Sequence, residues 1–511
     1  MPETYIKKIL GARVYDVAIE TPVDRARLLS KRLDNNILLK REDLQEVFSF
    51  KLRGAYNKMA SLTQEELDRG VVAASAGNHA QGLALAAQRM KVKATIVMPK
   101  TTPAIKVDAV RSRGAKVILH GDTFDEASKL ARELVVEKGM VYVHPFDDPE
   151  IIAGQGTIGV EILRQVSGDL DAIFLPVGGG GLAAGVSAYV RYVRPDVKIF
   201  AVEAEDSACL KAAMEAGERV VLDHVGIFAE GVAVAQIGEE TFRVIRDSID
   251  GVITCNTDEM CAAIKDIFDD TRSIAEPSGA LALAGLKKYI AETGACGQTL
   301  LAIASGANSN FDRLRYISER TEIGEQREAV LSVSIPEKPG SFKKFCAALG
   351  KRAITEFNYR MSDPKNAQIF VGVQVSPGGD DRHQLVEMLR EKGYLVTDLT
   401  ENEMAKLHIR HMVGGSAPAT IQNECVYRFE FPERPGALLN FLSTLGNRWN
   451  ISLFHYRNHG AAFGRVLVGM EVPEQERGEL ENYLTALNYP FINETNSIAY
   501  QQFLAVRSTT L

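Results

Sequence analysis

The sequence predicts an α/β protein in which a mostly parallel-sheet region is followed by two copies of a smaller β-α-β-β-α-β domain. Short, continuously apolar strands alternate with helical segments of about 10–15 residues from about Val14 to Phe311, as in parallel sheets covered on both faces. Beyond residue 325 a segment recurs at an offset of 96 or 97 residues, which indicates duplicated domains. A chain of 511 residues is too long for one core, so we expect about two to four domains.

The composition is that of a globular protein, with 46% apolar residues, 24% charged residues and a formal net charge of −7. A mildly acidic chain without basic blocks argues against nucleic-acid binding. No apolar run approaches the roughly 20 residues of a membrane span, and the start of the chain lacks a signal-peptide core, so we expect a cytoplasmic protein without membrane contact. The scattered cysteines contain no C-x-x-C pair, which predicts reduced thiols and no metal site: Cys209, Cys255, Cys261, Cys296, Cys346 and Cys425.

The first region divides into alternating strands and helices. Apolar runs predict strands over 70–74, 94–99, 115–119, 141–143, 172–175 and 199–202. Helical patterns cover 82–89, 104–113, 124–138, 156–165 and 182–193. Ligands of such sheets bind beyond the carboxyl ends of the strands. We therefore expect a ligand site among the loops that follow strands.

Lys51 lies where a loop enters a helical pattern that runs to about Leu62, directly after the aromatic Phe50. Burial and positive neighbours lower the pKa of an ammonium, and a neutral amine can attack a carbonyl to form a Schiff base. Taken alone, a lysine in the first turn of a helix is more often a solvated surface charge. The neighbouring motifs decide between these two interpretations.

Three strand-end loops carry further candidates. The loop of residues 75–82 contains Asn78 at the start of a helix, where free N–H groups suit a carboxylate or phosphate, although Asn78 could equally be a helix cap. Four successive glycines at 178–181 let N–H groups point into one concavity, which predicts a phosphate site rather than a flexible turn. Ser305 ends an apolar run and could bond a ring nitrogen or cap a helix.

An amine nucleophile, an anion loop, a phosphate cradle and a strand-end serine together fit one ligand, pyridoxal 5′-phosphate. The four segments resemble the signature of the fold-type II pyridoxal-phosphate enzymes, in particular the serine/threonine dehydratases, over about residues 13–320. That resemblance implies a two-lobed catalytic domain related to the tryptophan synthase β chain. It implies that Lys51 forms the Schiff base, Phe50 lies beside the ring, Asn78 bonds the phenolic oxygen and Ser305 faces the pyridine nitrogen. It also implies a phosphate held by Gly178, Gly179, Gly180, Gly181 and Leu182, and a substrate carboxylate held by the backbone of Ser75, Ala76, Gly77 and His79.

Two further groups near this site have double interpretations. His79 could act as a general base, but we expect it to support the carboxylate loop, because Lys51 released from the cofactor already lies at the substrate α-carbon. The segment 276–279 resembles a family segment near the cofactor, and a helix start explains it equally well.

The repeated segment begins at Leu331 and again at Tyr427, and each copy contains a Pro-Glu-Lys/Arg-Pro-Gly turn before a helix. The predicted order of elements in each copy is ferredoxin-like. The turns resemble those of ACT and ACT-like amino-acid-binding domains. We therefore expect a catalytic domain at 1–324, ACT-like regulatory domains at 329–401 and 425–496, and a linker at 402–424.

A duplicated ACT-like tail behind such a catalytic domain resembles the family of biosynthetic threonine dehydratases. This implies a homotetrameric enzyme that L-isoleucine inhibits, with L-valine opposing the inhibition. Tyr359 and Tyr456 occupy equivalent positions of the two repeats and are the candidate effector-binding residues, although each could be a half-buried strand tyrosine. Repeats that serve only oligomer contacts are the alternative.

The resemblance implies an ammonia-lyase that converts L-threonine, and also L-serine, to a ketoacid and ammonia as the first step of isoleucine synthesis. Lys51 would remove the α-proton, and the neutral Ser305 would make the ring a weaker electron sink than an acidic partner would. The alternatives are serine dehydration, racemisation or β-replacement, threonine synthase, and a non-enzymatic amino-acid sensor. A sensor has no need of the Schiff-base amine.

Overall fold

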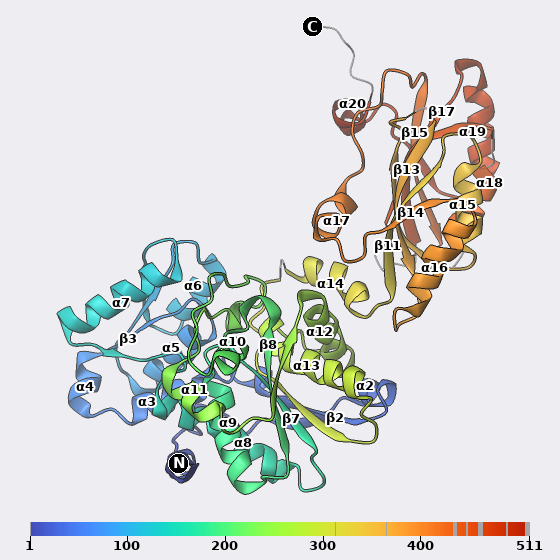
Figure 1. The fold of residues 1–511 in the computed structure, drawn as a ribbon. Helices are drawn as coiled ribbons and strands as arrows, with labels where there is room; N and C mark the ends of the chain where they lie inside the picture. The colour runs from blue at the N-terminus through green and yellow to red at the C-terminus, as the bar shows by residue number, and fades with distance from the viewer. Residues whose placement is uncertain are drawn as a thin grey trace. The chain divides into compact units, whose positions relative to one another are not determined.

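A computed structural model describes residues 2–311, 313–363, 365–432, 437–445, 448–457, 463–486 and 489–505 (Figure 1). The chain divides into two compact units, Met1–Thr321 and Glu322–Leu511. Among the described residues, no helix has the length and apolar character that a membrane crossing requires.

The first unit contains two sheets. A four-stranded parallel sheet has the order β5-β4-β3-β6. A six-stranded sheet has the order β1-β2-β10-β7-β8-β9, and only its edge strand β1 is antiparallel. The strands are β1 (Val23–Arg25), β2 (Asn36–Arg41), β3 (Val71–Ala74), β4 (Ala94–Met98), β5 (Lys116–Leu119), β6 (Val141–Tyr142), β7 (Ala172–Pro176), β8 (Lys198–Ala204), β9 (Gly251–Cys255) and β10 (Thr299–Ala304).

Helices cover both faces of each sheet, as the continuously apolar strands require (Figure 1). The helices that carry or face the candidate residues are α3 (Lys51–Ala60), α5 (Asn78–Met90), α8 (Pro149–Gln165), α9 (Gly181–Val193) and α13 (Pro277–Thr293). The others are α1 (Pro2–Leu10), α2 (Arg27–Arg32), α4 (Gln64–Arg69), α6 (Ala104–Arg111), α7 (Phe124–Lys138), α10 (Cys209–Ala216), α11 (Glu239–Ile245), α12 (Thr257–Thr271) and α14 (Arg313–Gly324), with short 3₁₀ turns η1 (Glu42–Leu44), η2 (Glu205–Ser207) and η3 (Glu230–Val232).

The predicted strands and helices of this unit are present, but two helices begin earlier than the sequence pattern indicated. Helix α5 begins at Asn78 instead of residue 82, so the candidate loop supplies the first helical turn. Helix α8 begins at Pro149 instead of residue 156. Asp148 caps α8 by accepting from the backbone N–H groups of Glu150 and Ile151, and proline suits the first helical position because it lacks an N–H.

In the second unit each repeat has the predicted order β-α-β-β-α-β. The first repeat contains β11 (Glu328–Pro336), α15 (Ser341–Leu349), β12 (Ile354–Arg360), β13 (Asn366–Gln374), α16 (Asp380–Glu391) and β14 (Leu395–Asp398). The second contains β15 (Glu424–Pro432), α18 (Ala437–Leu445), β16 (Asn450–Arg457), β17 (Phe463–Glu471), η5 (Glu474–Glu476), α19 (Arg477–Ala486) and β18 (Phe491–Asn493). Residues 433–436 of the second predicted turn lie outside the described residues.

The two repeats share one eight-stranded sheet of order β14-β11-β13-β12-β16-β17-β15-β18. Strands β12 and β16 join antiparallel, with Asn358 opposite His455 at the centre of the pairing. Phe357 lies opposite Tyr456, and Tyr359 lies opposite Phe454. Phe357 and Phe454 occupy equivalent positions of the two repeats, as do Tyr359 and Tyr456. The two pairs are therefore related by a local pseudo-twofold axis through the junction.

The segment predicted as a linker, 402–424, contains the helix α17 (Glu403–Leu407) and the turn η4 (Ile409–His411). Ala405 of α17 packs with Val330 and Phe370 on the sheet face opposite α15, α16, α18 and α19 (Figure 1). The C-terminal helix α20 (Ile498–Phe503) covers the same face over the second repeat, where Tyr500 packs against Val426. Both faces of the shared sheet are therefore partly covered.

Candidate active site

Lys51 is the first residue of α3, and it is half-buried. Its Nζ donates to the carbonyl oxygen of Pro145 at 3.0 Å and lies 5.4 Å from the centroid of the Phe50 ring. Desolvation lowers the pKa of this amine to about 8, against the opposing charge of Glu276. A much larger fraction of Lys51 is therefore neutral near pH 7 than of an exposed lysine.

The loop before Lys51 pairs with the loop that follows β10. The backbone N–H of Phe50 donates to the Ser305 carbonyl at 3.3 Å, and Ser49 forms a bridge with Gly306. Ser305 is buried, and its hydroxyl donates to the carbonyl of Ser278 at 3.3 Å. Residues about 250 positions apart in the sequence, Lys51 and Ser305, thus belong to the same polar centre.

Asn78 forms hydrogen bonds to residues of two further loops, Glu276 and Asn308. Its Nδ2 donates to Glu276 Oε1 at 2.6 Å, and its Oδ1 accepts from Asn308 Nδ2 at 2.7 Å. Burial raises the pKa of Glu276, and the hydrogen bonds from Ser278 and Asn78 oppose that shift. The amide of Asn78 is held in one orientation by these two contacts.

The four-glycine loop joins β7 to α9, and neighbouring groups orient its peptides. The carbonyls of Gly178 and Gly179 accept from Cys209 Sγ at 3.5 Å and from Thr241 Oγ1 at 2.7 Å. In a trans peptide the N–H points away from its carbonyl, so the N–H groups of Gly179 and Gly180 face the other side. Across residues 2–311 neither N–H has a hydrogen-bond partner, although the loop is buried.

Buried donors without acceptors are costly, and these two lie beside the free N–H groups at the start of α9. A phosphate group would accept from all of them. A side chain cannot replace this backbone: a Cβ on Gly179 would overlap the ring of Phe146, and Gly180 has a φ of +92°. Leu182 is buried in the first turn of α9. The residues present therefore fit the phosphate of pyridoxal phosphate.

The loop before α5 is arranged by its own short contacts. The N–H of Gly77 donates to Ser75 Oγ at 3.3 Å, and Ala76 is half-buried between them. His79 is buried, and its Nε2 lies 2.9 Å from the carbonyl oxygen of Val143. Since a carbonyl only accepts, Nε2 carries the proton. Desolvation, followed by the charge of Lys51, lowers the pKa of His79 to about 3, so the ring is neutral.

A segment that the sequence reasoning missed, residues 143–147, links Lys51 to the glycine loop. Pro145 accepts from Lys51, Phe146 packs over Gly179, and Asp147 Oδ1 accepts from the N–H groups of Glu240 and Thr241. The segment directly follows β6 at the carboxyl edge of the sheet. That position was the available signal, because the segment contains no motif of its own.

The two candidate effector residues lie in the second unit on the neighbouring strands β12 and β16. Tyr359 and Tyr456 are both buried, with exposed fractions of 3% and 1%. The hydroxyl of Tyr359 donates to the carboxylate of Glu337, which also accepts from Asn450 Nδ2 at 3.1 Å. Burial raises the pKa of Glu337, and the hydrogen bond from Tyr359 opposes this.

Two family models match the chain. The model of pyridoxal-phosphate-dependent enzymes matches residues 14–306, and that of the C-terminal regulatory domain of threonine dehydratase matches 319–409 and 415–504. The chain is 56% identical over 504 residues to the biosynthetic L-threonine dehydratase of Burkholderia multivorans, covering 98% of this chain and 99% of that protein. It is 50% identical to the chloroplastic biosynthetic threonine dehydratase of Arabidopsis thaliana, covering 95% of this chain and 82% of that protein.

Solved structures match about three fifths of the chain. The processed form of threonine deaminase isoform 2 from Solanum lycopersicum aligns with a TM-score of 0.62 and 51% identity, covering 62% of this chain and 93% of that one. Serine racemase from Dictyostelium discoideum aligns with a TM-score of 0.56 and 34% identity, covering 60% of this chain and 99% of that one. The chain belongs to the family of biosynthetic threonine dehydratases, which are pyridoxal-phosphate-dependent enzymes with a duplicated C-terminal regulatory domain.

Proposed function

We propose that the protein is a threonine ammonia-lyase that converts L-threonine to 2-oxobutanoate and ammonia and also accepts L-serine. The observation that carries the proposal is the amine of Lys51, whose pKa is lowered to about 8 and which donates to the carbonyl of Pro145, directly before the Phe146 that packs over the glycine loop. The 56% identity to a biosynthetic threonine dehydratase over nearly the whole chain supports the choice of threonine.

The residues divide the work among binding, orientation and proton transfer. Gly178–Gly181 and Leu182 would hold the phosphate, Phe50 would lie beside the ring, Asn78 would bond the phenolic oxygen, and Ser305 would face the ring nitrogen. When bound, pyridoxal phosphate supplies an electron sink for negative charge at the substrate α-carbon. The neutral amine of Lys51 takes the α-proton, and the backbone of Ser75, Ala76, Gly77 and His79 binds the substrate carboxylate.

We propose further that the second unit makes the enzyme responsive to amino acids, with L-isoleucine inhibiting and L-valine opposing the inhibition. This is supported by the match of residues 319–409 and 415–504 to a regulatory-domain model, and by Tyr359 and Tyr456, which occupy equivalent positions of the two repeats on the neighbouring strands β12 and β16. The reaction would begin isoleucine synthesis from threonine, carried out by a homotetramer in the cytoplasm.

The test is ketoacid release from L-threonine and from L-serine by purified protein, with and without L-isoleucine and L-valine. We expect threonine turnover that isoleucine lowers and valine restores, and no turnover or visible cofactor absorbance in Lys51→Ala. Threonine turnover that isoleucine does not change would support the lyase activity and contradict the regulatory proposal. Substantial threonine turnover by Lys51→Ala would contradict the role of Lys51.

Serine dehydration or racemisation is the second candidate, because the first unit aligns with serine racemase at 34% identity. Chiral chromatography of the products from L-serine separates the two reactions. D-serine as the main product, with threonine left unchanged, would favour the racemase.

A further inference from the structure

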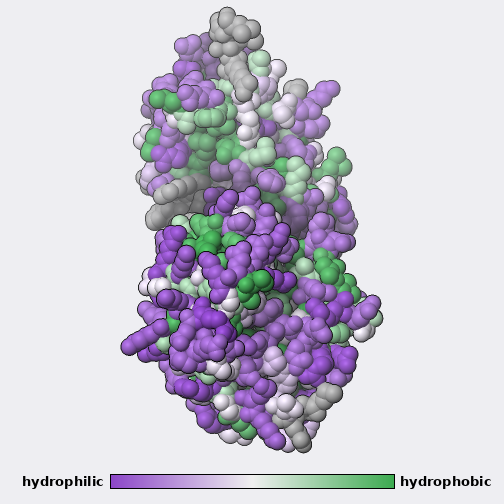
Figure 2. Space-filling view, turned by 90° about the vertical axis from the view of Figure 1, so that its left-hand side faces the viewer, coloured by the Kyte–Doolittle hydropathy of each residue, from purple (hydrophilic) through white to green (hydrophobic). Residues whose placement is uncertain are grey.

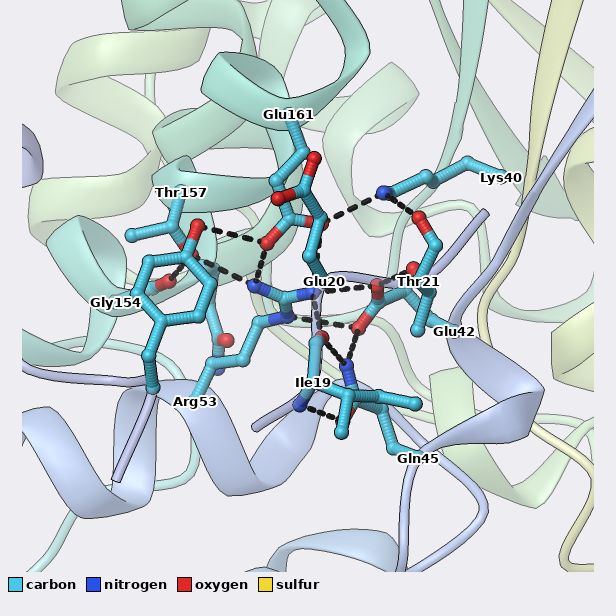
Figure 3. Close-up of polar contacts among 12 residues, drawn as sticks. Ile19, Glu20, Thr21, Lys40, Glu42, Gln45, Arg53, Gly154, Thr157 and Glu161 are labelled. Carbon is cyan, nitrogen blue, oxygen red and sulfur yellow. Dashed lines mark hydrogen bonds and ion pairs between the residues drawn. The ribbon is translucent and has the colours of Figure 1, made fainter. Parts of the chain in front are cut away.

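Two residues beyond Lys51, the side chain of Arg53 enters a fully buried group of charges. About 200° of helix rotation separates two such positions, so Arg53 lies on the side of α3 away from Lys51. The side chains of Lys40, Glu42, Arg53 and Glu161 are all 0% exposed. We call these four residues the Arg53 network (Figure 3).

Arg53 holds both carboxylates with its guanidinium fork. Its Nε and Nη2 donate to Glu42 Oε2 and Oε1, each at 2.8 Å. Its Nη1 and Nη2 donate to Glu161 Oε1 at 2.6 Å and Oε2 at 3.0 Å. Two bidentate pairs on one guanidinium fix its plane as well as its position.

Lys40 balances the charge of the network. Its Nζ donates to Glu161 Oε2 at 2.6 Å and to the carbonyl oxygen of Thr21 at 2.5 Å. Neutral groups complete the carboxylates: Thr21 Oγ1 donates to Glu42 at 2.5 Å, and Tyr15 Oη donates to Glu161 at 2.9 Å. Two cations therefore face two anions with their hydrogen-bonding groups satisfied.

The network joins elements that are far apart in the sequence. Lys40 belongs to β2 of the six-stranded sheet, Glu42 to η1, Arg53 to α3 and Glu161 to α8. Beside it, α3 and α8 touch at their backbones, because a Cβ on Gly154 would lie 2.7 Å from the Cα of Gly54. The network and this crossing together leave α3 little freedom to rotate or slide.

Burying four charges is a poor way to gain stability, since apolar side chains of similar size often serve as well or better. Directional contacts of this kind instead select one arrangement of the surrounding elements. We propose that Arg53 is a positioning residue: its double carboxylate clamp sets the rotation of α3 and thereby the place of the Lys51 amine. The proposal rests on Lys51 being the amine that binds the cofactor.

Three variants of the full-length enzyme test this. Arg53→Lys keeps the charge but loses the fork, and the double variant Arg53→Gln/Glu42→Gln removes one cation and one anion together. Arg164→Gln is the control, because Arg164 lies on α8 close to Glu161 in sequence but pairs with Glu20 at the surface. Thermal unfolding and circular dichroism establish that each variant is folded.

The first readout is independent of turnover. Apoenzyme is titrated with pyridoxal phosphate, treated with borohydride and digested, and the fraction of Lys51 that carries the reduced adduct is measured by mass spectrometry. The second readout separates kcat from KM for L-threonine. We expect the control to match the wild type, and both network variants to bind the cofactor more weakly and trap less of it on Lys51.

A misplacement of about 1 Å is enough to lower kcat by about a hundredfold, and we expect kcat to fall far more than KM rises. Folded variants with unchanged trapping and kcat would overturn the proposal. Loss of the fold in both network variants would also overturn it, because the network would then be needed for folding and not for placing Lys51. Absence of trapping on Lys51 in the wild type would instead contradict the proposed function.

Discussion

At the scale of single residues, the chemistry proposed for Lys51 depends on an amine that loses its proton. Burial favours the neutral form of Lys51 and lowers its pKa to about 8, because the charged form loses its hydration. Below that pH the neutral fraction falls about tenfold for each pH unit, and above it the fraction approaches a constant. The pH dependence of cofactor attachment therefore reports on this group.

We expect the rate at which the apoenzyme attaches pyridoxal phosphate to rise by about tenfold per pH unit below 8 and to level off above it. Stopped-flow measurement of the visible absorbance gives the rate, and a small lysine derivative in solution is the reference for the cofactor's own ionisation. A rate that keeps rising to about pH 10.4, the pKa of an ordinary lysine, would contradict the shift.

The glycine loop makes a second prediction at this scale. Gly180→Ala places a Cβ 2.9 Å from Ile237 Cδ1 and Thr241 Oγ1, at a φ of +92° where L-residues cost about 1–2 kcal/mol. Relief of this strain turns the N–H groups away from the phosphate position. We expect weaker binding of pyridoxal phosphate, measured by spectroscopic titration.

Gly294→Ala is the matched control for this experiment. Gly294 ends α13 at a φ of +67°, with open space where a Cβ would stand. Its backbone strain is of the same kind, but it takes no part in the glycine loop. Equal loss of cofactor affinity in both variants would show that general strain, and not the cradle, is responsible.

At the scale of elements, the crossing of α3 and α8 depends on glycine. In Gly154→Ala the new Cβ would meet the backbone of Gly54 at 2.7 Å and the Arg53 carbonyl at 2.9 Å, so the helices must separate. We expect the free energy of unfolding to fall by about 1–3 kcal/mol, as in other overpacked cores. Urea denaturation measures the change.

Gly159→Ala on the same helix is the comparison. Its Cβ would meet the Val186 carbonyl oxygen at 3.3 Å, which a shift of a few tenths of an ångström relieves, and alanine favours a helix over glycine by up to about 1 kcal/mol. We expect it to be neutral or slightly stabilising. If both variants lower the free energy of unfolding by the same amount, the close crossing of α3 and α8 is not the reason for glycine at position 154.

Motifs and periodicity were enough to predict most of these elements, and the misses have physical causes. The start of α8 was placed late because Gly154 weakens the helical pattern before residue 156, yet a glycine is what the close crossing with α3 requires at that position. The Arg53 network was missed because a charged residue is ordinarily predicted to be exposed when only the sequence is known. Only the fold brings Lys40, Glu42 and Glu161 to the guanidinium.

At the scale of the whole molecule, the sequence repeat predicted two ferredoxin-like domains but not their union in one sheet. Each repeat specifies its own strand order by local pattern. The pairing of β12 with β16 joins residues about 97 positions apart, and no periodicity of the sequence predicts this pairing. The apolar residues at the junction, such as Phe357 and Phe454, fit a strand edge that is paired and not exposed.

A shared sheet predicts that the two repeats unfold together. Phe454 of the second repeat is fully buried, and its ring centroid lies 5.3 Å from that of Phe357 and 6.1 Å from that of Phe342, both in the first repeat. Phe454→Ala should cost the second unit about 3–5 kcal/mol, because it leaves a cavity at the junction.

Hydrogen exchange measured by mass spectrometry locates that loss. In one cooperative unit, amides of β11 and β13 in the first repeat lose protection by the same factor as those of β15 and β17 in the second. Amides of β3 and β4, which belong to the other compact unit, are the internal reference and should not change. Protection lost in the second repeat alone would mean that the repeats are separate folding units joined only by an edge, and an effector bound to one would then have no structural route through the sheet to the other.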